Sequence, residues 1–95
     1  MPNLQQITDG VRTVAMEFPI KRAELFGSYA DRRARADSDV DLLVEFDTPR
    51  VSLLTLNQIK YRLEELLEVD VDLVHLPLPQ SSIIEIGRRI PVYGA

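Results

Sequence analysis

Apolar residues recur at helical spacing in two long stretches of this chain. Over roughly residues 3–17 they are separated by three or four positions, Pro19 limits the helix at its end, and the repeated residues are Leu4, Ile7, Val11, Val14 and Phe18. Over roughly residues 52–68 the same spacing follows Ser52, a favourable N-cap, and involves Leu56, Ile59, Leu63, Leu66 and Leu67. Both stretches predict amphipathic helices that turn an apolar face toward a core.

Other segments follow a period of two, which is typical of strands. Residues 39–46 alternate strictly: one side carries Val40, Leu42, Val44 and Phe46, and the other carries Asp39, Asp41, Leu43 and Glu45. A second alternating run occupies residues 69–76. Residues 23–26 form a short apolar segment of strand length that ends at Gly27. The three segments are predicted to form one sheet.

The remaining segments are shorter. Residues 29–36 are rich in alanine and arginine and predict a short helix, and the isoleucine-rich segment from residue 81 predicts a last short helix that ends near residues 87–90. Residues 91–93 predict a terminal edge strand. We therefore expect one small α/β domain over residues 1–95, in which the two long helices cover the apolar face of the sheet.

Composition narrows the function classes. With 45% hydrophobic and 27% charged residues the chain has the balance of a folded globular protein. Its 11 basic and 15 acidic residues give a net charge of −4, which disfavours broad binding to nucleic acid or to anionic lipid. The chain has no cysteine and no apolar run near the roughly 18 residues that span a bilayer. We expect a cytoplasmic protein without a membrane partner and without direct nucleic-acid binding.

The candidate chemistry lies in the acidic residues of the predicted strands. Asp39 and Asp41 are two positions apart, so their carboxylates project to the same side, about 7 Å apart along the backbone. If residues 69–76 pair beside this strand, Asp72 supplies a third carboxylate; in a different register Asp70 would supply it. A pair of such charges at 4 Å repels by about 4 kcal/mol at an effective dielectric of 20. A cluster of oxygen ligands alone is best stabilised by Mg²⁺ or Mn²⁺, which suits a phosphorylated substrate.

A second feature fits the same substrate class. Gly27 and Ser28 follow a predicted strand, where backbone N–H groups and a hydroxyl can hold a phosphate and the glycine allows close approach. The metal site and the phosphate site would then be neighbours.

Together these features resemble the DNA polymerase beta-like nucleotidyltransferase superfamily. Its signature, glycine and serine followed after ten residues by D-x-D, is matched by Gly27-Ser28 and Asp39-Val40-Asp41. The surrounding residues 25–30 and 38–46 look like the minimal (MNT) branch of the superfamily. Asp72, after the leucine-rich helix, matches the place of the family's third carboxylate. The resemblance covers nearly the whole chain.

The resemblance implies a polymerase beta-like α/β (α+β) fold, with a small mixed β-sheet and helices packed on one face. It implies two Mg²⁺ ions on three aspartates: Asp39 and Asp41 would bind both ions, and Asp72 would bind the catalytic ion and help to activate the acceptor. Gly27 and Ser28 would hold the triphosphate of ATP or another nucleoside triphosphate. A nucleoside monophosphate would pass to an acceptor hydroxyl with loss of pyrophosphate.

The resemblance also implies a partner. Minimal members are typically paired with a helical HEPN-type protein, often a ribonuclease toxin, which they neutralise by docking or by adenylylating a tyrosine. This chain departs from the family at Asp31-Arg32, where many minimal members carry Arg-Gly. The departure alters the loop over the triphosphate, so two functions stay open. One is a protein adenylyltransferase that acts as an antitoxin, and the other is a non-catalytic antitoxin that binds its partner.

Overall fold

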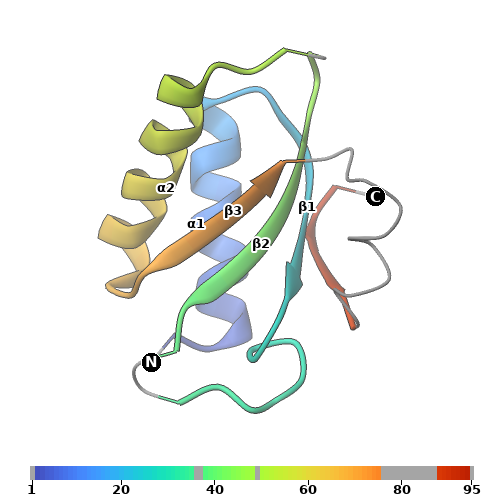
Figure 1. The fold of residues 1–95 in the computed structure, drawn as a ribbon, viewed down its shortest axis with the longest axis vertical. Coiled ribbons are helices and arrows are strands. Elements are labelled where there is room, and N and C mark those ends of the chain that lie inside the picture. Colours follow the sequence, from blue (N-terminus) through green and yellow to red (C-terminus); the bar gives the residue numbers. More distant parts are fainter. Residues whose placement is uncertain (1, 36–37, 49, 76–87, 95) are drawn as a thin grey trace.

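The computed structural model describes residues 2–35, 38–48, 50–75 and 88–94 (Figure 1). Along the chain, the helices and strands of these residues are α1 (Leu4–Glu17), β1 (Ile20–Phe26), β2 (Val40–Phe46), α2 (Leu53–Leu67), β3 (Val71–His75) and β4 (Ile90–Tyr93). None of the helices in these ranges is long and apolar enough to cross a membrane.

The strands form one mixed sheet in the order β3-β2-β1-β4. β1 is antiparallel to both of its neighbours, β2 and β4, whereas β2 and β3 are parallel. A parallel pair needs a crossover connection, which α2 supplies. This confirms the predicted sheet, and β4 confirms the predicted terminal edge strand.

Both helices lie on one face of the sheet (Figure 1). The apolar side of β2 is fully or almost fully buried against them, and the core residues shared by helices and strands include Ile7, Val11, Val14, Leu25, Val40, Leu42, Val44, Ile59, Leu63 and Val71. The predicted two-layer arrangement is thus confirmed. Leu43 is also buried, although it lies on the opposite side of β2 with the acidic residues.

Capping residues fix where α1 and α2 begin and where α2 ends. Asn3 caps α1, accepting a hydrogen bond from Gln6 N (2.8 Å), and the Gln6 side chain accepts one from Asn3 N (2.9 Å). Ser52 caps α2 by accepting from Thr55 N (3.1 Å), as the sequence predicted. α2 ends where Glu68 adopts a left-handed conformation with φ +58°.

The predicted short helix over residues 29–36 is wrong for the part that the structure describes. Residues 27–32 form consecutive turns, in which Asp31 N donates to Gly27 O (3.0 Å) and Arg33 N donates to Ser28 O (2.8 Å). Arg32 has φ +59°, and a residue in the left-handed region interrupts a right-handed helix. The last predicted helix lies mainly outside the described residues, and Ile90, near its expected end, belongs to β4.

Candidate active site

Asp41 and Asp72 lie side by side on neighbouring strands. The parallel register places their Cα atoms opposite each other, and Asp39 precedes β2 by one residue. Since side chains alternate along a strand, all three carboxylates belong to the sheet face opposite the helices. The backbone carbonyl of Asp70 accepts a hydrogen bond from Val40 N (2.9 Å), which fixes a register that favours Asp72 over Asp70 as the third carboxylate.

The pKa values of Asp39 and Asp41 are raised. The pKa of Asp41 is raised from an ordinary 3.8 to about 6, chiefly by burial and also by the charges of Asp72 and Asp39 and a hydrogen bond with Asp72. Loss of hydration also raises the pKa of Asp39, followed by the charges of Asp72 and Asp70, while Lys60 acts in the opposite direction. An arrangement that disfavours its own negative charge is one that a bound cation stabilises.

Gly27 lies directly against the Asp41 carboxylate. Phe26, the last residue of β1, is the cross-strand partner of Asp41, and the chain then turns at Gly27 with φ +74°. A Cβ atom at residue 27 would overlap Asp41 Oδ2 and would lie 3.1 Å from its Cγ. The backbone conformation therefore favours glycine at this position, and any side chain there would displace the Asp41 carboxylate. The structure brings the predicted glycine-serine turn next to the predicted acidic cluster.

The carboxylate oxygens of the three aspartates are the type of ligand that a hard cation prefers. The three side chains are carboxylates, which suit Mg²⁺ or Mn²⁺. Within the described ranges, however, no three histidine, cysteine, aspartate or glutamate side chains form a group that could hold a metal ion. The aspartates share a face without enclosing an ion, and Mg²⁺ commonly uses one or two carboxylates and completes its shell with water and substrate phosphates.

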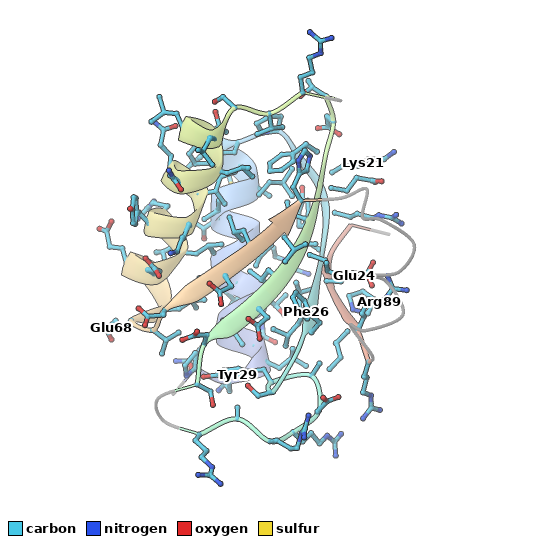
Figure 2. All side chains as sticks on the ribbon, viewed as in Figure 1. Lys21, Glu24, Phe26, Tyr29, Glu68 and Arg89 are labelled. Atoms are coloured by element: carbon cyan, nitrogen blue, oxygen red, sulfur yellow. The ribbon has the colours of Figure 1, made fainter. Side chains whose placement is uncertain are left out.

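Tyr29 lies within the turns that follow β1 (Figure 2). Its ring packs against the main core, and together with Ile7 and Leu25 it lines a cavity of about 470 Å³ on the helix side of β1. Its hydroxyl is buried and has no hydrogen-bond partner in the part of the chain that the structure describes, and burial raises the Tyr29 pKa. The hydroxyl therefore takes no part in the acidic face.

Ion pairs occupy β1 beside the acidic cluster. Arg22 Nε lies 3.1 Å from Glu45 Oε2 across β1 and β2, and Arg89 Nε lies 3.7 Å from Glu24 Oε2 (Figure 2). Such pairs contribute little to stability where they are exposed. They neutralise the acids on β1 and β2 that do not belong to the cluster.

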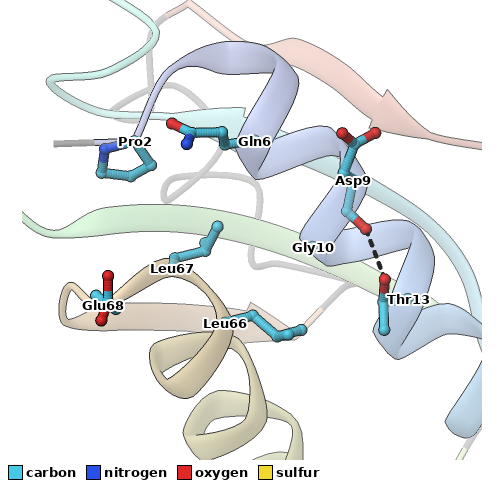
Figure 3. A pocket seen from close by; sticks show the side chains of 8 residues that line it. All are labelled: Pro2, Gln6, Asp9, Gly10, Thr13, Leu66, Leu67 and Glu68. Carbon is cyan, nitrogen blue, oxygen red and sulfur yellow. Dashed lines mark hydrogen bonds between the residues drawn. The ribbon is translucent and has the colours of Figure 1, made fainter.

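Another groove of about 470 Å³ separates α1 from the end of α2 (Figure 3). Gly10 lies at its floor, where a Cβ would be 3.2 Å from Leu67 Cδ2, so the glycine allows the two helices to approach closely. The groove is lined by Pro2, Gln6, Asp9, Gly10, Thr13, Leu66, Leu67 and Glu68. It contains none of the predicted site residues and lies on the helical layer.

Sequence reasoning missed one contact close to the site. Glu64 of α2 accepts a hydrogen bond from the backbone N–H of Val71 (3.0 Å), the residue before Asp72. Lys60 Nζ lies 4.0 Å from the same Glu64 oxygen. The spacing of Lys60 and Glu64 by four residues could have predicted their ion pair. Their position beside β3 depends on how α2 packs.

The mixed sheet carries helices on one face. On its other face, a glycine turn lies against paired strand carboxylates. This combination defines the nucleotidyltransferase class of fold. The model of the nucleotidyltransferase domain family matches residues 9–91. The chain belongs to this family, is of its minimal type, and is a nucleotidyltransferase.

Two relatives illustrate the similarity. MJ0435 of Methanocaldococcus jannaschii is 40% identical over 72 residues, which cover 76% of each chain. The protein adenylyltransferase MntA of Thermococcus cleftensis is 40% identical over 76 residues, covering 80% of this chain and 76% of the relative.

Solved structures agree on the fold. A structure described as a minimal nucleotidyltransferase is 34% identical, with a TM-score of 0.75, and covers 95% of this chain and 96% of that one. The MNT antitoxin in complex with the tri-AMPylated HEPN toxin of Shewanella oneidensis has a TM-score of 0.72 and 19% identity, covering 97% of this chain and 73% of that one. At that identity the second similarity shows the fold alone.

Proposed function

We propose that this chain transfers AMP from ATP to a tyrosine hydroxyl of a HEPN-type toxin and thereby acts as its antitoxin. The observation that carries the proposal is the register that pairs Asp41 with Asp72 beside the Gly27 turn. The protein adenylyltransferase name of the Thermococcus relative and the AMPylated HEPN toxin bound to the Shewanella antitoxin support AMP transfer to a protein and a HEPN-type partner.

Two Mg²⁺ ions fit this proposal. Asp39 and Asp41 would hold both ions, and Asp72 would hold the one nearer the acceptor. When bound, the ions neutralise the triphosphate and lower the pKa of the acceptor hydroxyl. The raised pKa of Asp41 supports this assignment, because a bound cation would stabilise the charged form that burial and the neighbouring carboxylates disfavour.

The chain's own residues would position the reactants. Backbone N–H groups at the Gly27 turn and the Ser28 hydroxyl would donate hydrogen bonds to the triphosphate. The acceptor oxygen forms a bond to the α-phosphorus, the bond from that phosphorus to the β-phosphate bridging oxygen breaks, and pyrophosphate leaves with the bonding electron pair. The hydroxyl proton passes to the Asp72 carboxylate and from there to solvent.

The acceptor would approach the acidic face. Both α1 and α2 cover the other side of the sheet (Figure 1), and Asp39 and Asp72 are exposed. These residues bring carboxylates to a surface but leave the acceptor hydroxyl to another molecule. A protein partner that presents a tyrosine to this face meets that requirement.

The test uses the chain with its co-purified HEPN partner, ATP and Mg²⁺. Intact mass spectrometry should show the partner gaining one AMP mass or a small multiple of it. Asp41→Asn should abolish the gain, whereas Asp47→Asn, which removes an exposed carboxylate just after β2, should not.

The second candidate is an antitoxin that acts by docking alone. Its supporting observation is Arg32, which holds a left-handed conformation in the turn beside the site. If Asp41→Asn neutralises the partner as well as the unaltered chain does, and neither modifies it, the docking function replaces the enzymatic one.

A further inference from the structure

β3 is an edge strand, and its first residue presents an amide away from the sheet. Val40 N donates to Asp70 O (2.9 Å), and the register pairs Val40 with Val71. In a parallel pair of strands, the residue that lies opposite such a donor points its own N–H away from the donor's strand. The Val71 N–H therefore points away from β2. Among the described residues, β3 has only β2 beside it in the sheet, so the Val71 N–H finds no strand partner there on its outer side.

Glu64 supplies the missing acceptor. Its Oε2 accepts from Val71 N at 3.0 Å, and its side chain is only 22% exposed. Val71 is fully buried, and a buried amide without a partner is costly, so this bond is important for the start of β3. Lys60 Nζ, 4.0 Å from the same oxygen, keeps the carboxylate partly neutralised.

The bond lies one residue before Asp72. β3 contains only five residues, Val71–His75, and Asp72 is the second of them. Strand ends fray when their amides are unpaired, and an edge strand has hydrogen-bonding neighbours on one side alone. The position of the Asp72 carboxylate beside Asp41 therefore depends on what holds the backbone at Val71.

We infer that Glu64 is a positioning residue for the reaction: through the Val71 amide it fixes the start of β3 and so the place of the Asp72 carboxylate beside Asp41. The effect of Glu64 on the rate of AMP transfer rests on the proposed function. Its effect on the backbone at the start of β3 does not, and the two effects can be tested separately.

Three substitutions at Glu64 distinguish its hydrogen bond with Val71 N from its negative charge. Glu64→Met removes the acceptor at similar length, and Glu64→Asp keeps the charge but shortens the side chain by one methylene. Glu64→Gln removes the charge but keeps an oxygen that can accept from Val71 N. Glu65→Gln is the matched control, since Glu65 is one residue further along α2, 76% exposed, and pairs only loosely with Arg62 at 3.9 Å.

The first measurement is amide hydrogen exchange in the protein alone. Glu64→Met and Glu64→Asp should each speed exchange at Val71 by about tenfold or more, as expected for loss of a hydrogen bond to a charged group. Leu43, which is buried and whose N–H points toward β1 rather than β3, should stay unchanged. Glu64→Gln, which keeps a neutral acceptor, should speed exchange at Val71 clearly less than Glu64→Met does, and Glu65→Gln should leave Val71 within about threefold of the unaltered protein. Unchanged exchange at Val71 in Glu64→Asp, or equal acceleration at Leu43, would overturn the inference.

The second measurement is AMP transfer to the HEPN partner. Glu64→Asp should lower kcat by about tenfold and leave KM for ATP nearly unchanged, because Asp39, Asp41 and the Gly27 turn are intact, and Glu64→Gln should restore most of the rate. An equal loss in Glu65→Gln, or no rescue by Glu64→Gln, would reject the positioning role. If the unaltered chain transfers no AMP, the proposed function fails, and the exchange experiment still decides whether Glu64 fixes β3.

Discussion

Gly27, the residue after β1, lies so close to Asp41 of β2 that a side chain at residue 27 would have to displace the Asp41 carboxylate. A Cβ there would overlap Asp41 Oδ2 and lie 3.1 Å from Asp41 Cγ, and φ at Gly27 is +74°. The glycine of the predicted phosphate turn and the central carboxylate of the predicted metal site are thus in direct contact. The contact restricts which side chains residue 27 can carry and where the Asp41 carboxylate can lie.

Gly27→Ala should therefore damage both the fold and the site. The left-handed conformation costs an alanine about 1–2 kcal/mol of unfolding free energy, and the new methyl group must displace the Asp41 carboxylate. Gly94→Ala is the control, because Gly94 also has a positive φ, +82°, but lies against Arg22. Both variants should lose stability in thermal denaturation, and calorimetry should show weakened Mg²⁺-ATP binding only for Gly27→Ala.

Ser28→Ala tests the phosphate turn more gently. Removal of one hydroxyl should weaken ATP binding by about 1 kcal/mol, or up to about 3 kcal/mol if the bond is to a charged oxygen. Ser38→Ala is a matched control, since the Ser38 hydroxyl accepts from Arg35 N (2.7 Å) within its own loop. Equal ATP affinities for Ser28→Ala and the unaltered chain would rule out a role for this hydroxyl.

Asp41→Asn should stabilise the ligand-free protein at neutral pH. The folded-state pKa of Asp41, about 6, lies above its ordinary 3.8, so the folded chain binds the proton more tightly than the unfolded chain. The corresponding stability is fully present below about pH 4 and is lost as the pH rises through 6. With solvent screening, Asp41→Asn should gain about 1 kcal/mol at pH 7.5 and nothing near pH 4, as measured by urea denaturation. A gain that does not vary with pH would contradict the assigned cause.

Metal binding should depend on the nucleotide. Mg²⁺ gives up its water reluctantly and often relies on substrate phosphates, so calorimetry should detect weak binding of Mg²⁺ alone and tighter binding of Mg²⁺ with ATP. Asp39→Asn should reduce the metal-dependent part of ATP binding. Asp9→Asn, an exposed carboxylate of α1 on the helical layer, should leave it unchanged.

Arg32→Gly should stabilise the turn beside the site. Arg32 has φ +59°, and relief of this left-handed conformation outweighs the greater chain entropy of glycine, giving a net gain of about 0.5–1 kcal/mol. Arg33→Gly should lose a similar amount, because Arg33 has no positive φ and glycine only adds freedom to the unfolded chain. Thermal denaturation of both variants distinguishes backbone strain from loss of positive charge.

The amino-acid sequence by itself determined those helices and strands in which apolar residues recur at a regular spacing. Period-two alternation predicted β2 and placed Asp39 and Asp41 on one side, and helical spacing predicted α1 and α2 within a residue or two at each end. These features are local, since they follow from side-chain direction along a helix or a strand. Together with the glycine-serine turn, they were sufficient to predict the family.

The tertiary structure decided what depends on neighbours distant in the chain. Strand order and register placed Asp72, rather than Asp70, opposite Asp41, and packing of α2 beside β3 brought Glu64 to the Val71 amide. Residues 29–36 have the composition of a helix, but residues 27–32, which begin at Gly27 against Asp41, form turns instead. Strand pairing and helix packing are set by the whole buried core, and no local sequence pattern records them.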